Sequence, residues 1–359
     1  MKHAIVFGGY GVFGSHVARE LAKRGIKLVL VGRDRARAES FAKSLETGHN
    51  AAVADLSDFD SCRKLLNESC VAVNCAGPFH SQNTALLDAC LEAGSHYVDI
   101  ADDRAYVQTV RRYGERFRER GLVAAYGCSS LPGISGALAL AACEGISEKP
   151  RHGRITLFIG NRNPKGIAAV SSLVCGLGRP ITAPQGTLRG FNDREVVTLP
   201  SPFGQRGVFN FDAPDYDLFP GLIGVQSVVV KVGFELRSAT YTMALLAKLH
   251  ANWTPRAARM LALAGKPLQW LGSSGGAVMT ELFWPDGTAR SATMHSGQDG
   301  QRMAALPCAV ATERLCRAEQ TMHGSLTAYE LCGGKSLLQQ LETEGFQLTV
   351  THGTATDRT

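Results

Sequence analysis

The chain opens with short apolar runs that alternate with stretches of helical periodicity. Three of these runs, Ala4–Phe7, Ile26–Val31 and Val71–Ala76, are partly β-branched, and an amphipathic stretch follows each. Alternation of this kind is typical of βαβ units, in which the strands form a parallel sheet. It predicts an α/β fold with a Rossmann-type parallel sheet domain over residues 1–131.

Beyond residue 131 the pattern changes to period-2 runs such as Arg154–Ile159. The runs Met279–Trp284 and Thr288–Met294 flank a Pro-Asp-Gly turn, which is typical of a β-hairpin. We therefore expect an inserted α+β domain with antiparallel strands over 132–303, the part that would carry substrate contacts and any homodimer interface. Strong helical spacing then returns, and we expect the segment 304–359 to lie back against the Rossmann domain.

A glycine-rich turn joins the first apolar run to the first amphipathic stretch. Its Gly-x-Gly-x-x-Gly spacing is the dinucleotide-binding fingerprint, in which the glycines permit a tight turn, close approach of a pyrophosphate, and helix–strand packing. The free N–H groups at the start of the helix attract phosphates. The alternative is a turn that only packs a helix on a sheet. The residues expected to bind the cofactor here are Gly9, Tyr10, Gly11, Val12, Phe13 and Gly14.

The tip of the second predicted strand distinguishes between two cofactors. An NAD site usually has an acidic residue there, bonded to the ribose 2′-hydroxyl. This chain has Gly32 followed by Arg33, and a guanidinium can bind a 2′-phosphate with two hydrogen bonds, which favours NADP over NAD. Asp34 has the spacing of an NAD acid, about 20 residues beyond the fingerprint. We instead expect Asp34 to cap a helix that begins at Arg35.

Two later strand ends complete the predicted cofactor site, because ligands bind at the carboxyl ends of parallel strands. Asp55 and Leu56 follow the third predicted strand and would contact the adenine. The fourth predicted strand breaks into a tight turn, and the residues expected to lie beside the nicotinamide half of the cofactor are Asn74, Ala76, Gly77 and Pro78.

These motifs, taken together, resemble the saccharopine dehydrogenase-like family of NAD(P)-dependent oxidoreductases. The resemblance includes the fingerprint, Val31-Gly32-Arg33, the segment from Asn74 to Phe79, and the Pro132-Gly133 turn. It implies a Rossmann domain, an inserted α+β domain, and a cleft between them with the nicotinamide at its base. Members of the family act on C–N bonds of amino-acid adducts, oxidise amino acids, or reduce double bonds in lipid precursors. Phe79 and His80 stand here where the lysine-pathway enzymes have a tyrosine, so the acid–base residues of those enzymes do not carry over.

Hydride transfer needs one titratable side chain to handle a proton. His80, whose ordinary pKa suits a proton shuttle, and Asp99 are the catalytic candidates. Each has a structural alternative, since His80 can be a surface residue near a helix start and Asp99 can cap a helix. The candidates for substrate binding are Phe79, Tyr126 and Arg206, of which Arg206 would bind a substrate carboxylate.

Composition excludes several other classes of protein. A net charge of +6 with scattered basic residues does not indicate a nucleic-acid surface. No apolar run approaches the roughly 18 residues that a membrane span needs. The ten cysteines show no metal-binding spacing, so we expect no metal site, free core thiols, and a cytosolic location in which no signal peptide precedes the strand at Ala4.

The sequence therefore predicts an NADP-dependent oxidoreductase that transfers a hydride to or from a small organic molecule, such as an imine, amine or amino-acid derivative. An enoyl-type reductase of a lipid or polyketide precursor is the alternative within enzymes. A non-catalytic NADP-binding regulatory protein is the alternative of another class.

Overall fold

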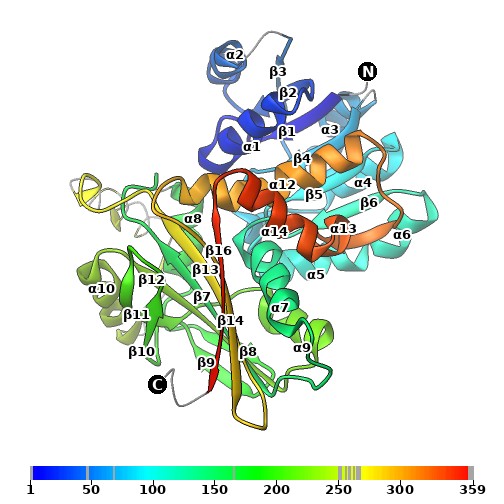
Figure 1. Cartoon of the computed structure of the whole chain (residues 1–359). Helices are drawn as coiled ribbons and strands as arrows, with labels where there is room; N and C mark the ends of the chain where they lie inside the picture. The colour runs from blue at the N-terminus through cyan, green and yellow to red at the C-terminus, as the bar shows by residue number, and fades with distance from the viewer. Residues whose placement is uncertain are drawn as a thin grey trace. The chain divides into compact units, whose positions relative to one another are not determined.

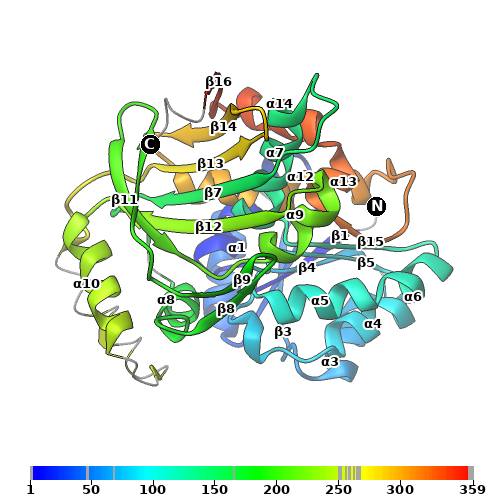
Figure 2. The same ribbon diagram turned by 90° about the horizontal axis from the view of Figure 1, so that it is seen from below.

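The computed structural model describes residues 3–45, 48–67, 69–164, 166–249, 253–254, 257, 260–261, 263 and 268–354 (Figure 1). The chain divides into two compact units. The first contains Met1–Ser129 and Ala304–Gly333, and the second contains Ser130–Met303 and Gly334–Thr359. Figure 2 shows the same elements from a second direction.

The first unit is built on a seven-stranded sheet in the order β15-β6-β5-β4-β1-β2-β3, and every pairing in it is parallel. Strand order reverses at β1, which lies between β4 and β2, so the edge above β1 and β4 is the switch point at which such sheets bind ligands. The strands are β1 (His3–Phe7), β2 (Leu28–Gly32), β3 (Asn50–Val53), β4 (Ser69–Asn74), β5 (His96–Asp99), β6 (Val123–Tyr126) and β15 (Gly324–Thr327).

Aspartate caps begin three helices of this unit. Asp34, Asp58 and Asp103 each accept a backbone N–H in the first turn of the helix that follows, which satisfies a donor that would otherwise lack a partner. The cap predicted for Asp34 is therefore confirmed. The helices of the unit are α1 (Val12–Lys23), α2 (Arg35–Ser44), α3 (Phe59–Leu66), α4 (Ala85–Ala93), α5 (Arg104–Arg112), α6 (Gly114–Glu119) and α13 (Ala328–Cys332). A short 3-10 turn, η1 (Phe79–Ser81), follows β4.

The second unit contains a mixed seven-stranded sheet in the order β10-β11-β12-β7-β13-β14-β16. The β12–β7 pair is parallel and the other pairs are antiparallel, including the predicted hairpin of β13 and β14. Its strands are β7 (His152–Ile159), β10 (Glu195–Leu199), β11 (Gly204–Asn210), β12 (Ser227–Phe234), β13 (Gly276–Phe283), β14 (Thr288–Ser296) and β16 (Gln347–Thr354). A separate small hairpin pairs β8 (Pro180–Ala183) with β9 (Gly186–Arg189).

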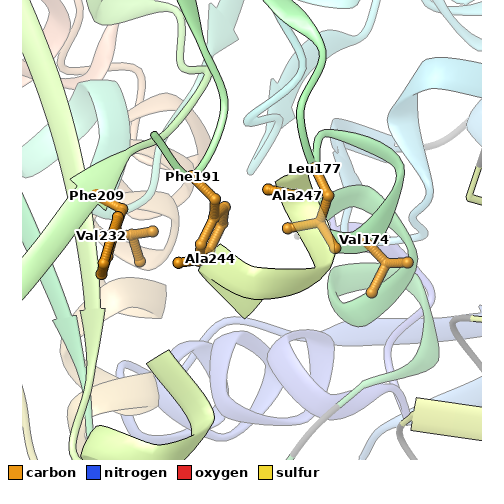
Figure 3. Packing of buried hydrophobic residues seen from close by; sticks show 7 residues of the cluster. All are labelled: Val174, Leu177, Phe191, Phe209, Val232, Ala244 and Ala247. Carbon is orange, nitrogen blue, oxygen red and sulfur yellow. The ribbon is translucent and has the colours of Figure 1, made fainter. Parts of the chain in front are cut away.

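Helices cover one face of the mixed sheet. Figure 3 shows part of this core, where Ala244 and Ala247 lie among Val174, Leu177, Phe191, Phe209 and Val232. The helices of the unit are α7 (Ser135–Cys143), α8 (Ile167–Cys175), α9 (Asp215–Ile223), α10 (Arg237–Lys248) and α14 (Gly334–Thr343). A short helical turn, Ser130–Ile134, precedes α7. Helix α12 (Gly300–Cys316) carries the chain from the second unit back to the first.

The end of the chain differs from the expectation that 304–359 lies as a whole against the Rossmann domain. The strand β15 pairs with β6 of the first sheet, as expected. The strand β16 instead pairs with β14 along its full length, from Thr288↔Thr354 to His295↔Gln347. The expectation is therefore wrong for Gly334–Thr354, which lie in the second unit. The β-like run at Gln347 shows that a strand forms but not which sheet edge it joins. The fold class, a parallel Rossmann-type sheet with a second α/β part, is confirmed.

Candidate functional site

The glycine loop after β1 has the close packing that the fingerprint requires. A Cβ at Gly14 would lie 2.1 Å from the carbonyl oxygen of Gly8, so this position has no room for any side chain. Gly11 is the N-cap of α1, and no side chain caps that helix. A Cβ at Gly11 would meet only the Gly8 oxygen, at 3.0 Å. The other side of Gly11 is therefore open to a phosphate, which the N-terminal amides of α1 would bind.

The loop also contacts the turn after β4, at the switch point. Gly8 has a φ of 74°, and a Cβ there would lie 2.9 Å from the backbone of Ala76. The Cys75 amide donates to the carbonyl oxygen of Phe7 at 2.9 Å. The fingerprint loop and the Ala76–Pro78 turn thus form one continuous backbone surface.

Tyr10 connects the fingerprint loop to the tip of β2. Its ring lies so close to Gly32 that a Cβ on Gly32 would be 2.3 Å from the ring, and its hydroxyl accepts the Asp34 amide at 2.9 Å. The Arg37 guanidinium lies 4.9 Å from the centre of the same ring. Arg33 is exposed at the same strand tip. Two guanidinium groups therefore lie where a 2′-phosphate is recognised, and Arg37 is a residue that the sequence analysis missed.

Asp55 and Leu56 lie beyond β3, as expected. The Asp55 carboxylate accepts the amide and the hydroxyl of Ser57, at 2.9 and 2.7 Å, and these bonds, together with the charge of Arg33, lower its pKa. Arg33 and Asp55 are therefore close enough to interact electrostatically, which places the tips of β2 and β3 at one end of the predicted cofactor site. Leu56 is half-buried.

Asn74 is fully buried at the end of β4, and its amide holds the following turn. Its Oδ1 accepts the Ala76 amide at 3.2 Å, while its Nδ2 donates to Gln82 Oε1 at 2.8 Å. Gln82 Nε2 in turn donates to the Ala76 carbonyl oxygen. The two side-chain amides therefore close a ring of hydrogen bonds around Ala76. Asn74 is suited to position the turn, whereas Ala76, Gly77 and Pro78 present the backbone that a cofactor would meet.

Two buried tyrosines extend this network. The hydroxyls of Tyr97 and Tyr106 are 2.9 Å apart, and Asn74 Nδ2 donates to them at 3.1 and 3.4 Å. The Phe79 ring packs 5.4 Å from the Tyr106 ring and is 6% exposed. Phe79, predicted to contact substrate, therefore faces the interior. The sequence analysis did not find Gln82 or Tyr106, because their bonds to Asn74 depend on the fold.

Asp99 joins the ends of β5 and β6. It is fully buried, and its Oδ1 accepts the amides of Ala101 and Gly127 at 2.9 and 2.8 Å. Burial raises the pKa of its carboxyl to about 6, although the two amides favour the charged form. Asp99 therefore bonds the backbone that follows two strand ends, whereas the cap of the next helix, α5, is Asp103.

His80 is exposed on the turn after β4, at the same edge of the sheet. Asp102 lies near it. Loss of solvent raises the pKa of the Asp102 carboxyl to about 6, and the nearby imidazole opposes that shift. A histidine paired with a carboxylate whose pKa is raised is a common arrangement for proton transfer. The structure thus places His80 within electrostatic range of Asp102, a residue that the sequence analysis did not choose as a candidate.

Two other predicted residues, Tyr126 and Arg206, have structural surroundings of their own. Tyr126 is 4% exposed, and burial raises its pKa. Arg206 lies on β11 in the second unit, where its guanidinium is 5.5 Å from the centre of the Phe158 ring and donates to the Gln205 carbonyl at 3.0 Å. Arg206 therefore packs on the mixed sheet of the second unit.

No group of three or more histidine, cysteine, aspartate or glutamate side chains in the described ranges is arranged to hold a metal ion. All ten cysteines lie in those ranges, and none of them forms a disulfide bond. No helix among the described residues is long and apolar enough to cross a membrane.

The parallel sheet, the glycine loop and the basic strand tip define a dinucleotide-binding domain of the NADP type. The family described as "Saccharopine dehydrogenase NADP binding domain" matches residues 5–125. The resemblance given by the motifs is therefore confirmed over these residues. NADP is accordingly the cofactor of the domain, and the open side of Gly11 with Arg33 and Arg37 fits it.

Relatives among known proteins match a little over a third of the chain. A probable mitochondrial saccharopine dehydrogenase-like oxidoreductase of Arabidopsis thaliana is 30% identical over 151 residues, which cover 37% of this chain and 33% of that protein. A lipid droplet localized protein of Caenorhabditis elegans is 28% identical over 142 residues, with 36% of this chain and 33% of that protein covered. The match therefore spans about a third of the length of these relatives.

The fold of the whole chain also has a counterpart among solved structures. Saccharopine dehydrogenase (L-Glu forming) from Saccharomyces cerevisiae aligns with a TM-score of 0.69 at 12% identity, over 98% of this chain and 100% of that one. At this identity the likeness shows a common fold.

The names of the relatives contradict the cytosolic location expected from the sequence. The Arabidopsis thaliana relative is named as a probable mitochondrial protein, and the Caenorhabditis elegans relative is named as localized to lipid droplets. Free thiols and the position of the first strand do not determine a compartment, so that expectation is corrected.

Proposed function

We propose that this chain is an NADP-dependent oxidoreductase that transfers a hydride to or from a small organic substrate with a C–N bond, an imine, an amine or an amino-acid derivative. The observation that carries the proposal is the position of His80, an exposed histidine on the turn after β4, at the same sheet edge as the NADP loop and within electrostatic range of Asp102. A purely regulatory NADP-binding protein does not need an acid–base pair at that edge.

Each group has a distinct role in this proposal. NADP(H), when bound, supplies or accepts the hydride. The α1 amides and Gly11 hold the pyrophosphate, and the Asn74–Gln82 ring keeps the Ala76–Pro78 turn in place beside it. The His80 imidazole transfers the proton that accompanies the hydride, and the Asp102 carboxylate orients the ring and stabilises its protonated form.

Asp99 takes a supporting role. Its carboxylate is committed to the Ala101 and Gly127 amides, so its replacement is expected to loosen two strand ends rather than remove a proton carrier. The substrate class follows the names of the matched family and of a relative described as a saccharopine dehydrogenase-like oxidoreductase.

The test has two stages. NADPH oxidation is first screened with oxo-acid and amine mixtures and with enoyl thioesters. Turnover and NADPH affinity are then measured for His80→Ala and Asp102→Asn. His80→Ala should lower turnover by about 10²–10⁴ and leave NADPH affinity unchanged. Asp102→Asn should also lower turnover and change its pH dependence.

A matched control is His323→Ala, since His323 is exposed in the same unit but precedes β15, at the amino ends of the strands. Its turnover should equal that of the unmodified protein. If His80→Ala retains full turnover, the proton-transfer role is refuted. If NADPH binds but no substrate of any class is turned over, the regulatory alternative replaces the proposal.

A further inference from the structure

Helix α10 packs small side chains, together with Met243 and Leu246, against the core, and it leaves other large apolar side chains exposed. Thr240, Ala244 and Ala247 are 2%, 7% and 2% exposed, and the two alanines pack against the core around Phe191 (Figure 3). On the outer face, Leu245 and Leu249 are 63% and 62% exposed. The outer face of α10 therefore carries apolar area that the second unit does not use.

The exposed residues form one ridge. Tyr241, Leu245 and Leu249 are spaced four residues apart, so they lie along a single side of the helix. In both views α10 lies at the margin of the second unit (Figures 1 and 2).

A second apolar strip lies beside the amino end of this helix. Trp270 is 84% exposed, the highest value among the exposed large apolar side chains of the described residues, and Leu268 and Leu271 are 46% and 53% exposed. The strip is anchored, because Asn161 Nδ2 donates to the carbonyl oxygens of Leu268 and Leu271 at 2.5 and 3.0 Å.

Hydrogen bonds also connect the strip to the start of α10. The Glu235 carboxylate, two residues before that helix, accepts the amides of Asn161 and Ser273 at 2.8 and 2.7 Å. We call the two parts together the α10 surface, which consists of Tyr241, Leu245, Leu249, Leu268, Trp270 and Leu271.

Basic residues predominate in the segment that contains the α10 surface. The sequence contains no aspartate or glutamate between Glu235 and Glu281, whereas it contains five lysines and arginines there. Arg237 and Lys248, one at each end of α10, are both exposed. A second copy of the same surface would bring like charges together, which disfavours a homodimer through this face.

We propose that the α10 surface docks on an anionic lipid bilayer. Exposed leucines with an adjacent tryptophan insert into the boundary between headgroups and acyl chains, and arginine and lysine beside them bind lipid phosphates. An anionic partner also compensates the positive charge that a second copy would repel. The docking does not depend on the oxidoreductase activity proposed above.

The experiment measures co-sedimentation of the full chain with vesicles. The chain should bind vesicles that contain both phosphatidylglycerol and phosphatidylcholine. Its binding to vesicles of phosphatidylcholine alone should be at least about fivefold weaker. Added salt should release the chain from the mixed vesicles. Leu245→Ser with Leu249→Ser should weaken partitioning by at least about tenfold. Arg237→Ala with Lys248→Ala should weaken binding to the anionic vesicles by at least about fivefold.

Val196→Ser is the matched control, since Val196 is an exposed apolar residue, 47% accessible, on β10 outside the α10 surface. It should bind vesicles as the unmodified chain does. NADPH affinity of every variant should be unchanged, which shows that the chain is folded.

Two outcomes would overturn the proposal. The first is equal sedimentation of the leucine variant and the unmodified chain. The second is a chain that does not bind vesicles but forms a dimer in light scattering, and whose leucine variant is a monomer. The α10 surface would then be an interface between copies of this chain.

Discussion

Two glycines of the fingerprint loop should respond differently to the same substitution, alanine. A methyl group at Gly14 would lie 2.1 Å from the Gly8 carbonyl oxygen, 2.9 Å from the Gly8 carbonyl carbon and 3.1 Å from the Gly9 Cα. All three neighbours are backbone atoms, so the loop itself must move. A methyl group at Gly11 would meet one atom, the Gly8 oxygen at 3.0 Å, and would otherwise enter the space predicted for the pyrophosphate.

The expected magnitudes follow from these contacts. Forcing an additional methyl group into packed backbone lowers the free energy of unfolding by about 1–3 kcal/mol. The greater helix propensity of alanine within α1 offsets up to about 1 kcal/mol of that loss. Gly14→Ala should therefore lower the free energy of unfolding by about 1–2 kcal/mol and also weaken NADPH binding. Gly11→Ala should cost no more than about 1 kcal/mol of stability, the usual cost of an unfavourable N-cap. It should nevertheless weaken NADPH binding by at least about tenfold, because the methyl group displaces a phosphate from the amides.

The assays are denaturant unfolding without cofactor and titration calorimetry with NADPH. Gly221→Ala is the control, since that glycine lies in α9 with no atom within 4 Å of the added Cβ. It should leave both quantities unchanged or slightly raise stability. The reasoning is refuted if Gly11→Ala binds NADPH as tightly as the unmodified chain does, or if Gly14→Ala unfolds at the same denaturant concentration.

Two further predictions concern buried groups. Burial raises the pKa of the Asp215 carboxyl to about 7 in the folded chain. Between about pH 4 and 7 the carboxyl is therefore ionised in the unfolded state while it is still protonated in the folded state. The free energy of unfolding falls as pH rises through this range, by at most about 4 kcal/mol. Asp215→Asn should reduce this slope, measured as the melting temperature against pH, and an unchanged slope would contradict the burial argument. Gln82→Leu removes a partner from both Asn74 and the Ala76 carbonyl, and should cost about 1–3 kcal/mol of stability together with weaker NADPH binding. If calorimetry and unfolding both find this variant unchanged, the amide ring does not hold the turn.

The elements that bind the cofactor could be predicted from sequence because their signals are local. Residues within a few positions of one another determine a strand, a glycine turn, and a cap such as Asp34, and each of these formed where its pattern indicated. The β13–β14 hairpin follows from a turn between two period-2 runs.

The remaining features depend on contacts between distant residues. The role of Asn74 depends on Tyr97 and Tyr106, which are 23 and 32 residues away along the chain. The burial of Phe79 depends on Tyr106 as well. A strand-end asparagine has the same local pattern whether its amide faces a cofactor or the core, so the sequence could not distinguish the two.

The same limit explains the terminal strand and α10. The period-2 pattern of β16 does not specify its partner, and the partner is β14 of the second unit. The sequence analysis did not single out α10, and both faces of this helix carry apolar residues. Only the packing of Ala244 and Ala247 shows that Leu245 and Leu249 face outward.

The most direct test of the account is the affinity of the unmodified chain for NADPH and for NADH, measured side by side by calorimetry, with Arg33→Ala as the diagnostic variant. NADPH should bind at least about tenfold more tightly than NADH, because the guanidinium at the β2 tip bonds the 2′-phosphate. Arg33→Ala should lose most of that difference and leave NADH binding unchanged. Equal or tighter binding of NADH by the unmodified chain would contradict the assignment of this strand tip to NADP.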